Sequence, residues 1–361
     1  MKKLSLILGA LLAVGAVAQA KEQVIVAPMV EEVIIAEPVV EQIVLQDNTF
    51  RPSGYVGLEY RAYGNTEGHG DKVNSTSLTQ DEWNRGANTY SRLQTTFGVQ
   101  ATENFRLEGR IRDYNDLERN DNSRANVKEG TETRLRAFYK HSDLLTSRVE
   151  YKDYVSDHEL YEYQLRITPY RNEGGIVDMF TIAPKYAYKK YKNGTDYRNT
   201  LGTDLYLTGN LPLGFTWENN LYLDYNMYNN EVLITGVDNN GKLETKDKEF
   251  VTTWEFYLYN TVALYVSDTY TLDFNFEGGY DPYKSTQYKG LNLVEGSVRK
   301  DKESYSLYTA MDVSLTYDIT EALTVKTGLG AEYRNWDIEA QSEARDWRWQ
   351  PFAYASMNIK F

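Results

Sequence analysis

The chain ends in RDWRWQPFAYASMNIKF (residues 345–361), and this stretch decides the fold. Apolar and polar side chains alternate along it, which predicts a β-strand with two different faces. The apolar face carries Trp347, Trp349, Pro351, Ala353, Ala355, Met357, Ile359 and Phe361. The other face carries Arg348, Gln350, Phe352, Tyr354, Ser356, Asn358 and Lys360. In a chain with a mean hydropathy of -0.58, this ending predicts a strand that meets lipid on one face and closes a barrel against the first strand.

The N-terminal segment MKKLSLILGALLAVGAVAQA (residues 1–20) has the form of a secretory signal peptide. Two lysines precede an apolar run, and the small residues Ala18 and Ala20 predict cleavage before Lys21. No later segment approaches the roughly 18–20 continuous apolar residues that a transmembrane helix requires. The exported chain is therefore expected to be either soluble or a closed membrane barrel.

Residues 21–53 differ from the rest in being rich in Val, Ile, Glu and Pro. Pro28 and Pro38 argue against a continuous helix or a central strand. We expect a periplasmic extension here. The alternative is a short segment that docks on the cell wall or on a neighbouring subunit.

Composition narrows the possible partners. The formal net charge is -13, which argues against nucleic acid as a partner. The absence of cysteine excludes disulfides and thiolate metal sites, and we expect neither a metal nor a cofactor. The 31 tyrosines argue against disorder and suit a barrel in outer-membrane lipid with aromatic girdles at its two interfaces.

Alternation recurs from Gly54 to the end of the chain. It predicts an all-β fold, a transmembrane antiparallel up-and-down β-barrel of about fourteen strands over residues 54–361, with twelve or sixteen strands as alternatives. The expected strands lie near 54–64, 88–101, 104–115, 132–141, 145–156, 158–169, 178–190, 196–211, 214–228, 247–266, 269–283, 303–318, 322–337 and 345–361.

The connections test this count, because outer-membrane barrels have long outer loops and tight periplasmic turns. Short turns are predicted at 101–104, 141–145, 210–214, 266–269 and 318–322. Long polar connections are predicted at 65–87, 116–131, 229–246 and 284–302, with shorter ones at 190–196 and 338–344. Two places fit the pattern badly, because 155–158 is short for an outer loop and 171–177 is long for an inner turn.

Charged residues on the predicted inner face are unevenly distributed. A basic wall is predicted from Arg92, Arg106, Arg110, Arg112, Arg134, Arg136, Arg148, Arg166 and Lys152. An acidic wall is predicted from Glu218, Asp224, Glu255, Asp273, Glu277, Asp312 and Glu332. Opposed walls would set up a transverse field that orients dipolar solutes. The alternative is that these residues pair with neighbours such as Glu108 and Glu150.

An enzymatic site is not expected. A hydrolase needs a nucleophile or an activated water beside an oriented base. The three histidines are His69, His141 and His158, and of these only His158 has an adjacent Asp157. We interpret His158 as a solvated surface residue and predict no catalytic residues.

The stretch VDNNGKLETKD (residues 237–247) does not match a calcium-binding loop, because its glycine and ligand positions are wrong. Asn240 and Gly241 instead predict the tip of a β-hairpin that projects from the outer loop, with EVLITGV and KLETKDK as its arms.

Four blocks of the chain resemble the major outer-membrane porins of fusobacteria. They are ANTYSRLQTTFGV (87–99), FNFEGGYDPYKSTQYK (274–289), GAEYRN (330–335) and RDWRWQPFAYASMNIKF (345–361). The resemblance implies a trimeric, water-filled, weakly selective channel whose surface loops take part in adhesion to other bacteria. It is weakest in the predicted outer loops.

We therefore expect a channel for passive diffusion of small hydrophilic solutes and ions in the cell outer membrane. The terminal Phe361 resembles the signal that the outer-membrane assembly machinery reads. One alternative is a surface adhesin or structural barrel whose outer loops bind partner cells and whose lumen is incidental or closed by 116–131. A substrate-specific channel is a third possibility, although the inward Tyr206, Tyr222, Tyr257 and Tyr259 suggest no obvious aromatic ladder.

Overall fold

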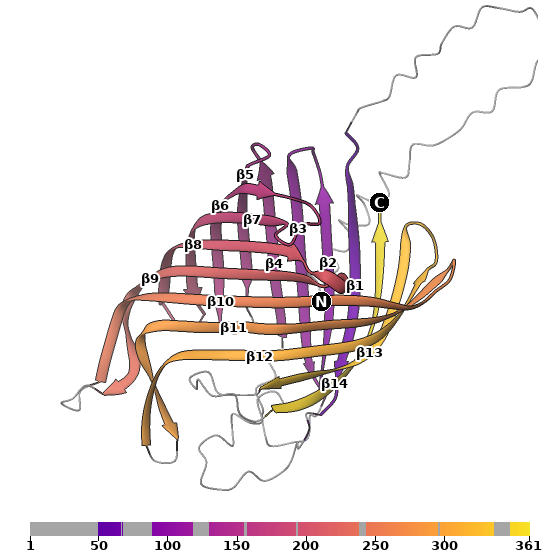
Figure 1. Ribbon diagram of the computed structural model, residues 1–361. Coiled ribbons are helices and arrows are strands. Elements are labelled where there is room, and N and C mark those ends of the chain that lie inside the picture. Colours follow the sequence, from indigo (N-terminus) through magenta and orange to yellow (C-terminus); the bar gives the residue numbers. More distant parts are fainter. Residues whose placement is uncertain are drawn as a thin grey trace, which may run out of the picture.

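The computed structural model describes residues 50–65, 67, 89–117, 130–154, 157–192, 194–237, 243–294, 297–335 and 347–361. They form one closed barrel in which fourteen strands pair antiparallel with their neighbours in chain order (Figure 1). The strands are β1 (Ser53–Tyr63), β2 (Tyr90–Gln100), β3 (Phe105–Asp116), β4 (Gly130–Lys140), β5 (Leu145–Asp153), β6 (His158–Arg171), β7 (Met179–Tyr191), β8 (Tyr197–Asn210), β9 (Thr216–Val237), β10 (Leu243–Val266), β11 (Tyr270–Val294), β12 (Ser297–Asp318), β13 (Leu323–Asn335) and β14 (Trp347–Lys360). The predicted all-β, fourteen-strand barrel is confirmed.

The last strand closes the barrel as its sequence predicted. β14 pairs with β13 on one side and with β1 on the other, so that Val56 lies opposite Ile359 and Ala62 opposite Ala353. Phe361 completes the seam, because its amide donates to the Gly54 carbonyl at 3.0 Å and its carbonyl accepts from the Gly54 amide at 2.8 Å. We call the end of the barrel where Gly54 and Phe361 lie the terminal end, and the opposite end the loop end.

All six connections at the terminal end are short. They span 101–104, 141–144, 172–178, 211–215, 267–269 and 319–322. The 172–178 connection fitted the alternation badly because it is longer than the others. In the structure it folds back on its neighbours, since the Ile176 carbonyl accepts from Trp217 Nε1 at 2.9 Å and the Gly175 carbonyl accepts from the Asn210 amide at 3.0 Å.

Two predicted outer loops are largely strand. β9 to β12 have 22, 24, 25 and 22 residues, so the predicted loops 229–246 and 284–302 become extensions of two hairpins. β11 contains Pro282 and the ladder shifts register between Tyr280 and Tyr283, yet pairing resumes beyond this irregularity and continues along each hairpin. The two hairpins extend beyond the other strands in Figure 1. The hairpin arms expected around Asn240 are confirmed, and the tip at 238–242 lies outside the described residues.

The two faces of the wall differ sharply. Large apolar side chains on the outer face are exposed in the isolated chain, for example Val149 at 55%, Leu201 at 51% and Leu329 at 71%. Exposed tyrosines share this face: Tyr60, Tyr139, Tyr161, Tyr163, Tyr186, Tyr225, Tyr265 and Tyr317. The intervening residues point inward and are mostly polar or charged. Among the described residues, no helix is long and apolar enough to cross a membrane.

Glycines near the closure seam allow aromatic rings to lie flat on the neighbouring strand. Phe97 lies opposite Gly109, and Tyr354 lies opposite Gly328. A Cβ atom on Gly109 would lie 2.1 Å from the Phe97 ring, and one on Gly328 would lie 2.5 Å from the Tyr354 ring. The missing side chains therefore create the space that the rings fill, a device that also pins strand register.

The signal peptide (1–20) and almost all of the predicted extension (21–53) lie outside the described residues. The first strand begins at Ser53, one residue before the predicted boundary.

Candidate functional site: the charged lumen

The main cavity of interest lies inside the barrel, where side chains from opposite parts of the wall converge. Its volume is about 630 Å³. Strands β3 to β6 contribute Arg110, Arg134, Arg136, Arg148 and Arg166. Strands β9 to β12 contribute Glu218, Asn220, Tyr222, Glu255, Tyr257, Tyr259, Glu277 and Tyr308. Five residues of the predicted basic wall and three of the predicted acidic wall thus line the same cavity.

Three of the five cavity arginines have specific partners. Arg136 forms an ion pair with Glu150, which also accepts from Lys152 at 2.9 Å. Arg148 forms an ion pair with Glu162. These contacts agree with the alternative that neighbours pair along the wall, and the predicted partner Glu150 is confirmed.

Arg166 is held without a carboxylate. Its Nη1 donates to Gln164 Oε1 at 2.9 Å, and its guanidinium carbon lies 4.5 Å from the centre of the Tyr206 ring. This cation–π contact fixes the group and leaves its positive charge in the cavity.

Arg110 and Arg134 differ from the other three. They lie directly opposite each other on β3 and β4. Neither forms an ion pair with any described residue. The positions on either side are matched in charge, because Glu108 lies opposite Arg136 and Arg112 opposite Glu132. Between β3 and β4, like charges therefore meet at the pair that reaches the cavity.

Neutral donors contact three carboxylates of the acidic side. Tyr222 donates its hydroxyl to Glu255 at 2.8 Å, Asn220 donates to Glu218 at 2.7 Å, and Tyr308 donates to Glu277. Hydrogen bonds of this kind orient a carboxylate without neutralising it. These carboxylates are thereby held on the side of the cavity opposite the arginines.

Tyrosines surround the cavity more closely than the sequence suggested. Tyr206, Tyr222, Tyr257 and Tyr259 all line it. The Tyr257 and Tyr259 rings are stacked with centres 6.0 Å apart, and the Tyr206 and Tyr222 rings meet edge to face at 6.1 Å. Strand alternation predicted that these residues point inward, and the register of the neighbouring strands β8, β9 and β10 sets which rings meet.

The other predicted wall residues lie elsewhere. On the basic side, Arg92 pairs with Glu59 at 2.7 Å, Arg112 donates to Gln94 at 2.6 Å, and Arg106 pairs with Glu108 at 3.2 Å near the terminal end. On the acidic side, Asp312 accepts from Asn275 and from Tyr354, both at 2.9 Å. Asp224 is bound to a lysine described below, and Asp273 and Glu332 do not line the cavity.

Sequence reasoning missed Lys185, which holds together the inner wall from β7 to β9. Its Nζ lies 2.7 Å from Asp204 Oδ1 and 2.8 Å from Asp224 Oδ1, and only 7% of its side chain is exposed. Asp204 also accepts from Gln164 at 2.7 Å and from Tyr206 at 2.9 Å. The signal was present as a lysine at an inward position of β7, but its two partners follow from register, because Lys185 lies opposite Gly202, which in turn lies opposite Asp224.

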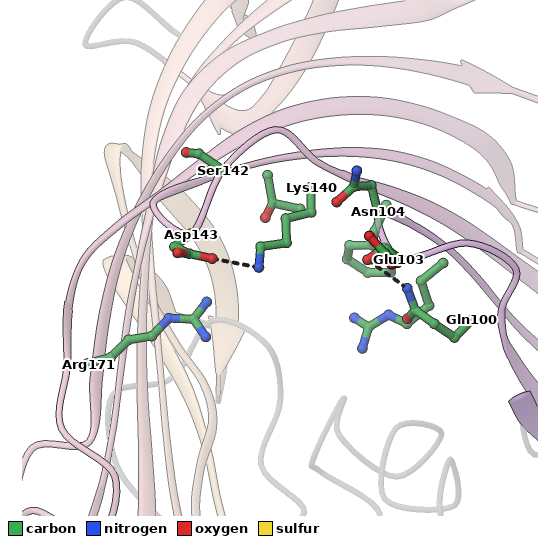
Figure 2. A pocket seen from close by; sticks show the side chains of 10 residues that line it. Gln100, Glu103, Asn104, Lys140, Ser142, Asp143 and Arg171 are labelled. Atoms are coloured by element: carbon green, nitrogen blue, oxygen red, sulfur yellow. Dashed lines mark hydrogen bonds and ion pairs between the residues drawn. The ribbon is translucent and has the colours of Figure 1, made fainter. Parts of the chain in front are cut away.

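A second cavity of about 380 Å³ lies at the terminal end. Figure 2 shows Lys140, Asp143 and Arg171 on one side of it and Gln100, Glu103 and Asn104 on the other. Lys140 Nζ lies 2.6 Å from Asp143 Oδ1, and this hydrogen bond lowers the pKa of Asp143 below its usual value. Arg106 reaches the same cavity and stacks over the Phe138 ring at 4.5 Å.

The interpretation of His158 as a solvated residue is wrong. His158 is 7% exposed, its Nδ1 lies 2.7 Å from Asp157 Oδ2, and its ring packs 4.2 Å from the Tyr154 ring. The first residue of β6 points inward at the loop end, where the tyrosines at the ends of β5 and β7 cover it. His141 donates to or accepts from Ser147 Oγ at 2.7 Å, and His69 lies outside the described residues.

Comparisons with known proteins add fold-level likeness only. No family model matches the sequence, and no curated protein matches it. A bacterial polysaccharide outer membrane secretin is 11% identical, with 85% of this chain and 98% of that chain covered and a TM-score of 0.40. The outer membrane channel DcaP of Acinetobacter baumannii is 10% identical, with 86% and 96% covered and a TM-score of 0.35. The NanC porin is 13% identical, with 64% and 93% covered and a TM-score of 0.30.

All three TM-scores are below 0.5, so these likenesses indicate no function for this chain. The resemblance to fusobacterial porins stays a prediction from the sequence.

Proposed function

We propose that this chain forms a water-filled channel across a bacterial outer membrane, through which small hydrophilic solutes and ions diffuse passively. The observation that carries the proposal is the cavity inside a closed barrel, lined by five arginines, three glutamates and several tyrosines. Fourteen strands about 4.8 Å apart and tilted by about 40° enclose a backbone diameter of roughly 28 Å, which is too wide for side chains alone to fill.

The outer face supports a membrane location. Its exposed side chains include Leu58, Val149, Leu201, Val262, Leu264, Val313, Leu315 and Leu329. An apolar exterior on a closed barrel is what a lipid bilayer accepts, because barrel closure leaves no unpaired strand edge in the hydrocarbon layer. Strands β1 to β8 have 9 to 14 residues, which matches the roughly 9–11 tilted residues needed to cross the hydrocarbon layer.

The opposed charges support weak selection among solutes. Arg110, Arg134 and Arg166 keep positive charge on one side of the cavity, and Glu255 and Glu277 keep negative charge on the other. In a narrow aqueous path with low-dielectric walls, such an arrangement produces a transverse field. Dipolar solutes are oriented by the field, and apolar solutes are excluded because they would displace hydration from the charged walls.

Three further features are proposed from the sequence. The chain is a homotrimer, Phe361 is read by the outer-membrane assembly machinery, and the predicted extension lies in the periplasm. With these features the barrel is oriented so that its terminal end faces the periplasm and its loop end faces outside.

The adhesin alternative depends on outer loops, and most of 65–87 and 116–131 lies outside the described residues. The observation in its favour is the length of β9 to β12, whose two hairpins project beyond the wall at the loop end. Adhesion through these hairpins is compatible with an open lumen. Deleting the hairpin tips would separate the two functions, since it should abolish binding to partner cells and leave permeation intact.

Conductance in a planar lipid bilayer tests the channel. The purified full-length protein, folded as judged by heat-modifiable migration on a gel, is expected to give large, near-ohmic current steps that close in threes at high voltage. Folded protein that inserts but passes no current would overturn the proposal and move the function to the projecting hairpins. Current that closes in single steps only would contradict the trimer.

A further inference from the structure

The register of β3, β4 and β5 places three cations side by side across the inner wall. Arg110 lies opposite Arg134, and Arg134 lies opposite Lys152. Like charges directly opposite each other destabilise a sheet, and each neighbouring position in the same register pairs an arginine with a glutamate. Between β3 and β4 the arginine pair thus breaks this charge matching, and both of its members line the cavity.

Within this row, Lys152 is compensated and the two arginines are not. Lys152 Nζ lies 2.9 Å from Glu150 Oε1, whereas neither Arg110 nor Arg134 has an ion-pair partner among the described residues. The nearest carboxylates on their own strands are occupied, because Glu108 binds Arg106 and Glu132 accepts from Tyr114 at 3.3 Å. Two adjacent guanidinium groups with free donors form a natural site for a carboxylate, which they can bind through parallel N–H···O bonds.

The opposite side of the same cavity fits a cation. Glu255 and Glu277 face the lumen and accept hydrogen bonds from Tyr222 and Tyr308, so their carboxylates are held in place. Tyr257 and Tyr259 lie beside them and present stacked ring faces, which also attract an ammonium group. The cavity thus presents arginines on one side and carboxylates on the other.

We propose that this cavity is a recognition site for small zwitterions of the amino-acid class, with the carboxylate bound by Arg110 and Arg134 and the ammonium group directed to Glu255 and Glu277. This inference rests on the proposed channel function and adds its preferred solute class. The site prefers solutes that carry both charges. A simple anion contacts only the arginines, and a simple cation contacts only the glutamates.

Swelling of proteoliposomes separates this preference from permeation in general. β-Alanine and lactamide are isomers with the same molecular formula, and only β-alanine is a zwitterion at neutral pH. We expect vesicles that contain the full-length wild-type protein to swell several times faster in β-alanine than in lactamide, after subtraction of the rate for protein-free vesicles. The ratio of the two rates is the measured quantity, because a change in pore width moves both rates together.

Two double variants test the two ends of the site. Arg110→Gln with Arg134→Gln is expected to bring the ratio close to one while lactamide entry stays the same or rises. Glu255→Gln with Glu277→Gln is expected to lower the ratio as well. Lys190→Gln, which removes an exposed charge from β7 outside the cavity, should keep the wild-type ratio. Heat-modifiable migration confirms that each variant is folded.

The outcomes that contradict the inference are distinct from failure of the channel. A wild-type ratio of one, with rapid lactamide entry, would show an open channel without the zwitterion site. If the ratio keeps its wild-type value after both arginines are replaced, the solute carboxylate does not bind at Arg110 and Arg134. A ratio unaffected by loss of both glutamates would show an anion site only. Absence of swelling in either solute would overturn the channel itself.

Discussion

Lys185 is the residue on which the inner wall between β7 and β9 depends. Replacing it with methionine would leave Asp204 and Asp224 facing each other without a cation, in a site where Asp204 is 3% exposed. Removing one partner of a buried ion pair is strongly destabilising, by about 3 kcal/mol. Lys185→Met is therefore expected to lower the unfolding midpoint of the detergent-solubilised barrel in urea.

Lys190→Met is the matched control for this loss, because Lys190 is exposed on the same strand. The triple variant that also carries Asp204→Asn and Asp224→Asn should recover most of the stability, since no charge is then left uncompensated. Equal midpoints for the wild type and Lys185→Met would show that the cluster does not contribute to stability.

Gly328 tests the fit between glycines and aromatic rings at the closure seam. A valine there would occupy space taken by the Tyr354 ring, whose hydroxyl donates to Asp312 at 2.9 Å. We expect Gly328→Val to destabilise the barrel by about 1–3 kcal/mol, as overpacking typically does. Thermal unfolding followed by the gel shift measures the effect, and Gly194→Val, where a Cβ would meet nothing within 4 Å, is the control. Equal unfolding temperatures would contradict the packing argument.

The sequence predicted which face of a strand each charged residue occupies but not which partner it finds. Period-two alternation was sufficient to point Arg110, Arg134 and Glu255 inward. Whether an inward arginine is free or paired depends on register, and register follows from turn geometry and bulges that a single sequence does not reveal. For this reason the distinction between Arg136, which is paired, and Arg134, which is not, emerged only from the structure.

The final strand is the element whose loss should reduce the yield of folded barrel most. Deleting Phe361 removes the two backbone hydrogen bonds to Gly54 and the ring that packs on that glycine. Two hydrogen bonds contribute about 2 kcal/mol in total. We expect the deletion to reduce the folded fraction obtained on refolding into lipid vesicles, as read from heat-modifiable migration.

Phe361→Tyr keeps the backbone bonds and most of the ring, and should refold like the wild type. If the deleted chain refolds in equal yield in vesicles but fails to reach the membrane in cells, then the assembly signal outweighs closure of the seam. Equal yield in both settings would contradict both roles assigned to Phe361.

Strand existence and order were predictable from the sequence, whereas strand length was not. The five predicted tight turns and the long inner connection at 171–177 follow from turn residues that interrupt the alternation. By contrast, the extensions of β9 to β12 lie in polar sequence that is typical of loops. They are strand because each arm finds a partner across a hairpin, a non-local condition that propensity does not encode.

At the scale of the whole molecule, the distribution of charge follows chain order. Because neighbouring strands in the chain are neighbours in the barrel, basic residues concentrated on β3 to β6 and acidic residues concentrated on β9 to β12 come to face the same cavity from different sides. This arrangement makes the lumen the conduction path in the proposed function, with ion selectivity set by the balance of its two sides.

The reversal potential across a planar bilayer under a salt gradient tests this claim most directly. Neutralising Arg110, Arg134 and Arg166 together should shift the reversal potential toward the value of a cation-selective channel. Neutralising Glu218, Glu255 and Glu277 together should shift the reversal potential toward the value of an anion-selective channel. In each variant the charged residues of the opposite wall stay in place. Conducting variants that both retain the wild-type reversal potential would contradict the account, since ions would then not pass between these walls.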